Sequence, residues 1–323
     1  MVDVPPPPSH APGPRPPFPP LVPAGWLDSH RGEVVVADVR WYLDGRSGAE
    51  AFAGGHLPGA VFVDLDTVLC GPPSRAHGRH PLPGPASFAA ALGALGIAGG
   101  DVVVAYDDAG GTVAGRLVWM LRALGQPAAL LDGGIQAWTG QLSRGPEQAP
   151  EPAACPARPW PAHRLATLED VATWTGGRSE AGGGGEATGG VVTTGGVVAT
   201  GGGEAGGRSV LVDARAPERY RGDVEPVDPR AGHVPGALSV PAVDHLDPAT
   251  ERFRQPEALR ARFSEAGIGP GDDVIVYCGS GVTACQGLLA LEAAGLGPGR
   301  LWPGSWSQWS ADPVRAVATG PGP

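Results

Sequence analysis

A buried strand, a glycine loop and a helix follow one another in the segment Val274-Ile275-Val276-Tyr277-Cys278-Gly279-Ser280-Gly281-Val282-Thr283-Ala284-Cys285. The apolar run Val274–Tyr277 is typical of a strand covered on both faces, and the pattern over Thr283–Ala294 predicts a helix. Cys278 therefore ends a strand at the sheet edge where α/β folds place their sites. Small loop residues let backbone N–H groups face the sulfur, and the helix N-terminus adds positive charge, so the thiolate is favoured. The alternative is a cysteine that only fills the core.

Two other cysteine chemistries use a similar layout, and the spacing argues against both. Cysteine phosphatases carry an arginine at the sixth position after the nucleophile, where this chain has Ala284. A thioredoxin-type site needs C-x-x-C, but the next cysteine, Cys285, lies seven residues after Cys278. We therefore expect Cys278 to act alone as the nucleophile and Cys285 to be a core residue.

The chain contains an internal repeat. Gly55-His56-Leu57-Pro58-Gly59-Ala60 returns as Gly232-His233-Val234-Pro235-Gly236-Ala237, and Ala37-Asp38-Val39-Arg40 has a counterpart in Asp213-Ala214-Arg215. Matched positions lie about 170–177 residues apart and keep the same order, which indicates a duplicated domain. Each half alternates short β-branched runs with helical patterns. We therefore predict an α/β fold of two tandem domains, each a mostly parallel sheet flanked by helices.

Glycine and proline make up 53 and 37 of the 323 residues, about twice their usual share in a soluble protein. Part of this excess lies in residues 1–23, which we predict to be a disordered proline-rich tail. Another part lies in residues 176–207, which we predict to be a flexible glycine-rich insertion. We assign residues 141–162 to a linker and residues 311–323 to a second tail.

Charge and cysteine usage exclude several classes of protein. A net charge of −10 argues against a nucleic-acid binder. No apolar stretch has the length of a membrane span, and the N-terminus lacks the pattern of a secretory signal. The four scattered cysteines suggest reduced thiols, so we expect the cytoplasm. Cysteine and histidine do not cluster at ligand spacing, and we expect neither a metal nor a cofactor.

The loop from Cys278 to Ala284 resembles the active-site loop of the rhodanese superfamily. Its Gly279-Ser280 pair is similar to that of the 3-mercaptopyruvate sulfurtransferases, whereas thiosulfate-preferring rhodaneses usually carry Arg-Lys there. The closing segment Pro303-Gly304-Ser305-Trp306-Ser307-Gln308-Trp309 and both Gly-His-Xaa-Pro-Gly-Ala turns belong to the same resemblance.

The resemblance implies two rhodanese-like domains with different roles. Residues 24–140 would form an inactive N-terminal domain, because Asp107 stands where the other half has Cys278. Residues 163–310 would form the catalytic domain. Rhodaneses transfer sulfur in two steps: a cysteine thiolate takes a sulfane sulfur from a donor as a persulfide, and an acceptor then removes it.

The resemblance also implies the site residues. Cys278 would be the nucleophile, with Ser280 and Asp66 as catalytic partners and His80 near the cleft. Four further residues of the loop would contact the substrate: Gly279, Gly281, Val282 and Thr283.

The identity of the donor depends on the charges around the loop. A 2-oxo acid carries a carboxylate, and Arg219 matches a substrate-binding arginine of the superfamily. The second such arginine usually lies nine positions later, where this chain has Asp228, and Arg230 is the nearest substitute. Because Gly279-Ser280 brings no positive charge, we expect 3-mercaptopyruvate to be preferred over dianionic thiosulfate.

Two alternatives stay open at this point: a thiosulfate sulfurtransferase, and a non-catalytic rhodanese-like module that binds a partner or senses oxidants. The expected acceptor is a small thiol, cyanide or a thioredoxin-like protein.

Overall fold

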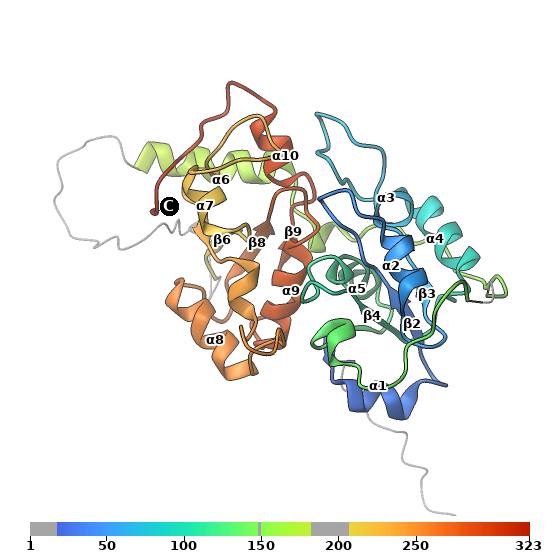
Figure 1. Ribbon diagram of the computed structural model, residues 1–323. Coiled ribbons are helices and arrows are strands. Elements are labelled where there is room, and N and C mark those ends of the chain that lie inside the picture. Colours follow the sequence, from blue (N-terminus) through green and yellow to red (C-terminus); the bar gives the residue numbers. More distant parts are fainter. Residues whose placement is uncertain (1–17, 148–149, 182–206) are drawn as a thin grey trace, which may run out of the picture.

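Two parallel sheets organise the chain, one in each half (Figure 1). The computed structural model describes residues 18–147, 150–181 and 207–323. The strand order is β1-β5-β4-β2-β3 in the first sheet and β7-β6-β8-β9 in the second. Without β1 the two orders correspond strand for strand, which confirms the predicted duplication and the α/β class.

The strands of the first sheet are β1 (Leu21–Val22), β2 (Val35–Asp38), β3 (Val61–Phe62), β4 (Val103–Tyr106) and β5 (Ala128–Leu131). Those of the second are β6 (Ser209–Asp213), β7 (Leu238–Ser239), β8 (Asp273–Tyr277) and β9 (Arg300–Leu301). Every neighbouring pair is parallel. All four residues of β4 and the last four of β8 are buried, as the continuous apolar runs predict.

Helices cover both faces of each sheet. The first domain contains α1 (Ala24–His30), α2 (Gly48–Gly54), α3 (Leu65–Val68), α4 (Pro85–Ala94), α5 (Ala114–Ala123) and the 3₁₀ helix η1 (Gly134–Ala137). The second contains η2 (Ala162–Arg164), α6 (Leu168–Ala181), α7 (Pro217–Arg221), η3 (Ala242–His245), α8 (Pro256–Glu265), α9 (Ala284–Ala293) and α10 (Ser305–Ser310). Within the described residues, no helix combines the length and the apolar character needed to cross a bilayer.

The repeated motifs form the same contacts in both domains. Arg40 pairs with Asp38 and donates a 2.7 Å hydrogen bond to the carbonyl of Gly55. Arg215 pairs with Asp213 and donates a 2.6 Å bond to the carbonyl of Gly232. In each domain this buried ion pair fixes the Gly-His-Xaa-Pro-Gly-Ala turn to the end of a strand.

The domains meet along helices α5 and α9, which lie side by side between the two sheets (Figure 1). One apolar cluster continues through both helices into the two cores. Each helix also sends a polar side chain into the loop that precedes its partner. Arg116 of α5 donates to the carbonyl of Gly281 at 2.8 Å, and Gln286 of α9 donates to that of Gly110 at 2.9 Å. Arg116 and Gln286 each stand two residues after the start of their helix.

The structure corrects two predicted boundaries. Residues 18–23 are not part of a disordered tail, because Leu21–Val22 forms β1 at the edge of the first sheet. An edge strand tolerates the neighbouring prolines, which lack N–H donors. Helix α6 extends to Ala181, six residues into the predicted insertion 176–207, since continuing a started helix adds a hydrogen bond for each residue fixed. Residues 1–17 and 182–206 lie outside the described residues.

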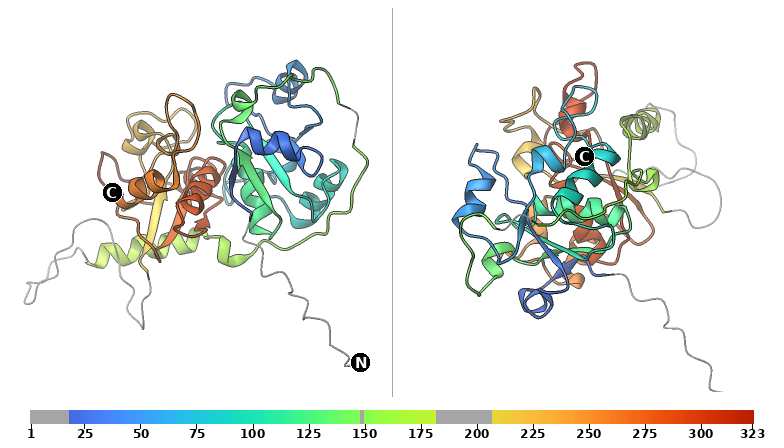
Figure 2. Two further views of the ribbon diagram at one scale, coloured as in Figure 1. Left: turned by 90° about the horizontal axis from the view of Figure 1, so that it is seen from below. Right: turned by 90° about the vertical axis from the view of Figure 1, so that its right-hand side faces the viewer.

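The predicted linker follows the outside of the first domain (Figure 2). Ala153 donates a backbone bond to Gly93, and the Trp160 indole donates to the carbonyl of Pro83 at 2.8 Å. These contacts attach the connection to helix α4 and its N-terminal approach before it enters the second domain.

Candidate active site

Cys278 lies at the carboxyl end of β8, at the bottom of the loop that leads into α9. The residue is buried, and the backbone N–H of Gly281 donates to its Sγ atom at 3.2 Å. Gly281 has a φ of +79°, and a Cβ at this position would lie 2.6 Å from the carbonyl oxygen of Pro303. The loop can therefore turn its N–H toward the sulfur only with glycine here.

The segment around α10 holds this loop in place through hydrogen bonds. The Oγ of Ser305 accepts the backbone N–H of Cys278 at 3.2 Å and donates to the carbonyl of Trp302. The N–H of Ser307 donates to the carbonyl of Gly279 at 2.8 Å. Ser305 holds a φ of 50°, which is costly for a residue with a side chain. Its two side-chain bonds stabilise this conformation and fix the backbone of Cys278.

Ser280 and His80 form a hydrogen-bonded pair across the domain interface. Nδ1 of His80 lies 2.8 Å from Oγ of Ser280, and Nε2 lies 3.8 Å from Oδ1 of Asp66. The indole of Trp41 donates to the other oxygen of Asp66 at 3.0 Å. Burial lowers the pKa of His80 to about 4, and the nearby cations Arg116 and Arg79 act in the same direction. The imidazole is therefore neutral near pH 7 and can exchange a proton with the serine hydroxyl.

A cavity of about 260 Å³ opens between the domains above Cys278. Seven of the residues predicted from the sequence line it: His80, Arg219, Cys278, Gly279, Ser280, Val282 and Thr283. Two other predicted residues contact members of this lining. Asp66 lies 3.8 Å from His80, and the backbone N–H of Gly281 donates to the sulfur of Cys278. The structure thus brings together, on one small cavity, a thiol, a hydroxyl–imidazole pair and a guanidinium.

The sequence matches a known domain family in both halves of the chain. Residues 24–141 and 203–312 each match the family described as the rhodanese-like domain. The chain belongs to the rhodanese family.

Individual rhodanese relatives cover nearly the whole chain. A Pseudomonas aeruginosa protein described as a probable 3-mercaptopyruvate sulfurtransferase is 40% identical over 295 residues, which is 89% of this chain and 93% of that protein. SseB of Mycobacterium tuberculosis, provisionally named a thiosulfate sulfurtransferase, is 39% identical over 298 residues, covering 89% and 91%. The crystal structure of SseA from Escherichia coli, titled as a 3-mercaptopyruvate sulfotransferase, superposes with a TM-score of 0.71 at 28% identity, covering 90% of this chain and 99% of SseA.

In the first rhodanese domain a carboxyl side chain occupies the position that corresponds to Cys278. Asp107 is completely buried at the end of β4. Its two oxygens accept four backbone N–H groups at 2.8–2.9 Å, from Ala109, Gly111, Val113 and Ala114. Burial raises the pKa of this carboxyl, and the four donors oppose that rise. The loop of this domain is therefore an anion cradle filled by its own side chain.

The structure does not bring Arg230 to Cys278. Its guanidinium donates instead to four backbone carbonyls of the C-terminal segment, those of Trp309, Ser310, Asp312 and Arg315, at 2.6–3.0 Å. Arg219 does reach the cavity, where its Nε and Nη2 atoms bind Glu225 and its Nη2 also contacts Asp228.

Trp41, Arg79 and Arg116 are among the residues of this rhodanese site that no sequence motif indicated. Trp41 and Arg79 line the cavity, and Arg116 joins its two sides by donating to the carbonyls of Gly281 and His80. Arg79 stands beside His80 in the sequence, a signal that could have found it. Trp41 and Arg116 lie in unremarkable positions of the sequence, and only the packing of the domains shows their role.

Proposed function

We propose that this rhodanese is a sulfurtransferase that moves sulfur from 3-mercaptopyruvate, through a persulfide on Cys278, to a thiol or cyanide. The observation that carries the proposal is the Ser280–His80 pair at 2.8 Å beside the Cys278 loop. When the C–S bond of this donor breaks, its electron pair stays on the carbon, and that carbon must then receive a proton. The Ser280–His80 pair can transfer this proton.

The chemistry balances with these groups alone. The Cys278 thiolate attacks the thiol sulfur of the donor, the C–S bond breaks, and its electron pair passes to the enolate of pyruvate. The thiol proton moves to the carbon through the hydroxyl of Ser280, with the neutral imidazole of His80 as its partner. The products are pyruvate and the Cys278 persulfide. An acceptor thiol then attacks the outer sulfur and leaves as a persulfide, which restores the thiolate.

The geometry of the first domain supports a persulfide in the second. The carboxylate oxygens of Asp107 and the outer sulfur of a persulfide on Cys278 stand the same number of bonds from the Cα atom. In the first domain four N–H groups bind the two carboxyl oxygens at that position. The corresponding loop in the second domain would stabilise the anionic outer sulfur in the same way.

The residues of the cavity support the 2-oxo acid donor over thiosulfate. Relatives at 40% and 39% identity carry the two different donor names, so overall similarity does not separate them. Gly279 and Ser280 contribute no charge to the loop, whereas Arg219, whose Nε and Nη2 are bound to Glu225, still offers its Nη1 as one charged donor to a carboxylate.

We further propose that the domains divide the work. Residues 24–140 would serve as the inactive partner and residues 163–310 as the catalytic domain, with the protein acting in the cytoplasm. The physiological acceptor would be a small thiol or a thioredoxin-like protein, because the outer sulfur must be reached from solvent.

Mass spectrometry of the protein after incubation with 3-mercaptopyruvate tests the proposal. We expect a gain of one sulfur atom, about 32 Da by ordinary atomic mass, localised to Cys278 and absent from Cys278→Ser. Cys285→Ser is the matched control, because burial raises the pKa of Cys285 to about 12 and keeps it a thiol. Absence of any adduct on the wild-type protein would favour the non-catalytic module instead.

A further inference from the structure

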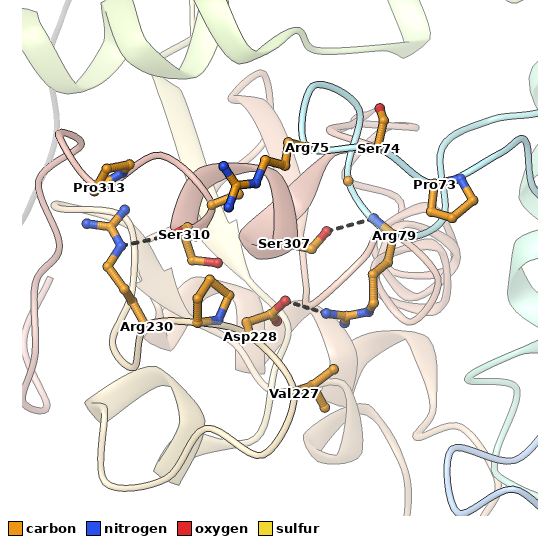
Figure 3. A pocket seen from close by; sticks show the side chains of 13 residues that line it. Pro73, Ser74, Arg75, Arg79, Val227, Asp228, Arg230, Ser307, Ser310 and Pro313 are labelled. Carbon is orange, nitrogen blue, oxygen red and sulfur yellow. Dashed lines mark hydrogen bonds and ion pairs between the residues drawn. The ribbon is translucent and has the colours of Figure 1, made fainter.

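A second and larger cavity lies beside the catalytic one where the two domains meet (Figure 3). Its volume is about 590 Å³, against about 260 Å³ for the cavity above Cys278. It is lined by the loop 73–79 of the first domain, by the segment 227–230 of the second, and by α10 with the turn that follows. Arg79 and Val227 line both cavities, so the two spaces share one wall.

The charged side chains of this larger cavity are mainly basic. Arg75 is exposed and has no ion-pair partner among the described residues. The guanidinium of Arg230 donates to backbone carbonyls, and no carboxylate of the described chain pairs with it. Asp228, the acid of this lining in the described chain, is 3% exposed and is already paired with Arg79 and Arg219. In a protein with a net charge of −10, this local positive charge favours an anionic ligand.

The α10 side of the cavity also carries an unpaired hydroxyl. Ser310 is 2% exposed, and its Oγ has no hydrogen-bond partner within the described chain. Buried hydroxyls are normally paired, since an unmade hydrogen bond costs free energy. In the view of Figure 3, Ser310 lies between the guanidinium of Arg230 and Ser307. The side chain can offer its hydroxyl to a ligand in the cavity by a change of its χ1 rotamer.

The sizes of the two cavities match the two substrates of the proposed reaction. The catalytic cavity of about 260 Å³ suits a three-carbon donor. The neighbouring 590 Å³ lies within the range of sites that hold larger ligands, about 300–1,000 Å³. In a two-step transfer the donor product leaves before the acceptor reacts, and only the sulfur of the acceptor must enter the catalytic cavity.

We propose that the larger cavity binds the sulfur acceptor, and that this acceptor is a small thiol that carries carboxylates. The proposal rests on the proposed function and names the substrate of its second step. The carboxylates bind Arg75 and the hydroxyl of Ser310, and the thiol extends past Arg79 and Val227 to the persulfide. The acceptor thiolate takes the outer sulfur, the S–S bond breaks, and its electron pair returns to Cys278 as a thiolate while the acceptor leaves as a persulfide.

Acceptor kinetics at saturating 3-mercaptopyruvate test the proposal, with glutathione and its diethyl ester as probes. The ester keeps the thiol and the length of glutathione and lacks both free carboxylates. For the wild type we expect a KM at least about fivefold lower for glutathione than for the ester. Arg75→Glu should raise KM for glutathione about ten- to thirtyfold without raising KM for the ester, because it places a negative charge against the carboxylates.

Two controls separate acceptor binding from donor binding and from folding. kcat/KM for the donor should stay within about twofold in Arg75→Glu, since Arg75 does not line the catalytic cavity. Arg144→Glu is the matched variant, because Arg144 is also exposed and lines neither cavity. Ser310→Ala should raise KM for glutathione about two- to fivefold with no loss of Tm, because the hydroxyl that it removes is unpaired.

Calorimetry with S-methylglutathione, which keeps both carboxylates and cannot accept sulfur, measures binding without turnover. We expect its affinity to fall about tenfold in Arg75→Glu and to stay within about twofold in Arg144→Glu. If the wild type transfers sulfur but Arg75→Glu leaves both KM and this affinity unchanged, the proposal is wrong. If the wild type forms no persulfide with any donor, the proposed function fails, and the calorimetry still decides whether this cavity binds the carboxylates.

Discussion

Replacing Arg116 tests whether one buried guanidinium sets the geometry of the site. Its Nη1 donates to the carbonyl of Gly281 at 2.8 Å and its Nη2 to the carbonyl of His80 at 2.9 Å, so it joins the Cys278 loop to the loop that carries His80. Arg116→Met keeps much of the apolar length and removes both donors. Each hydrogen bond from a charged donor contributes about 1.5–3 kcal/mol to folding stability. Removing the buried charge also removes its desolvation cost, which offsets part of the loss.

We therefore expect a net loss of about 1–3 kcal/mol of folding free energy, or roughly 3–10 °C in Tm for a protein of this size. The larger effect should be on kcat, which we expect to fall about ten- to a hundredfold as the distance between Ser280 and His80 relaxes. Thermal unfolding and steady-state kinetics measure the two quantities. Arg122→Met is the matched control, because Arg122 lies on the same helix and crosses the same interface to Glu292 of α9. A kcat within threefold of wild type for Arg116→Met, or an equal loss for Arg122→Met, would refute this reasoning.

Two further predictions concern the filled cradle and the buried imidazole. Asp107→Ala leaves four backbone N–H groups without their acceptor, so we expect a loss of about 4 kcal/mol or more in chemical denaturation; a loss under about 1 kcal/mol would contradict the cradle. Asp107→Asn, which keeps one acceptor oxygen, should lose less. The pKa of His80, about 4, lies below the ordinary 6.5, so the fraction of protonated imidazole becomes large only as the pH falls toward 4. The pH profile of kcat/KM should therefore show no loss centred near 6.5, and a loss there that His80→Gln removes would be evidence against a neutral imidazole.

The sequence predicted the fold well because its signals are local and repeated. The apolar runs that end at Tyr106 and Tyr277 form the strands β4 and β8, which are buried except for the first residue of β8. The two Gly-His-Xaa-Pro-Gly-Ala turns are held by equivalent ion pairs. The limits of the elements were less predictable. Leu21–Val22 joins the sheet because β5 offers it a free edge. This pairing links residues more than a hundred positions apart, so no local sequence pattern predicts it.

The sequence predicted the part of the cavity lining that one loop carries, and it did not indicate the part that the two domains build together. Cys278, Gly279 and Ser280 are contiguous, and a strand followed by a glycine loop identifies them. The sequence offers Arg230 as a second arginine beside Arg219, but the fold uses Arg230 to hold the C-terminal segment. Arg79 lies 149 residues from Asp228 along the chain, and no local pattern could pair them.

The comparison of two donors tests the account most directly. kcat/KM of the wild-type protein is measured for 3-mercaptopyruvate and for thiosulfate, with the same thiol acceptor. The uncharged Gly279-Ser280 loop and the Ser280–His80 pair predict a higher kcat/KM for 3-mercaptopyruvate. An equal or higher value for thiosulfate would contradict the account.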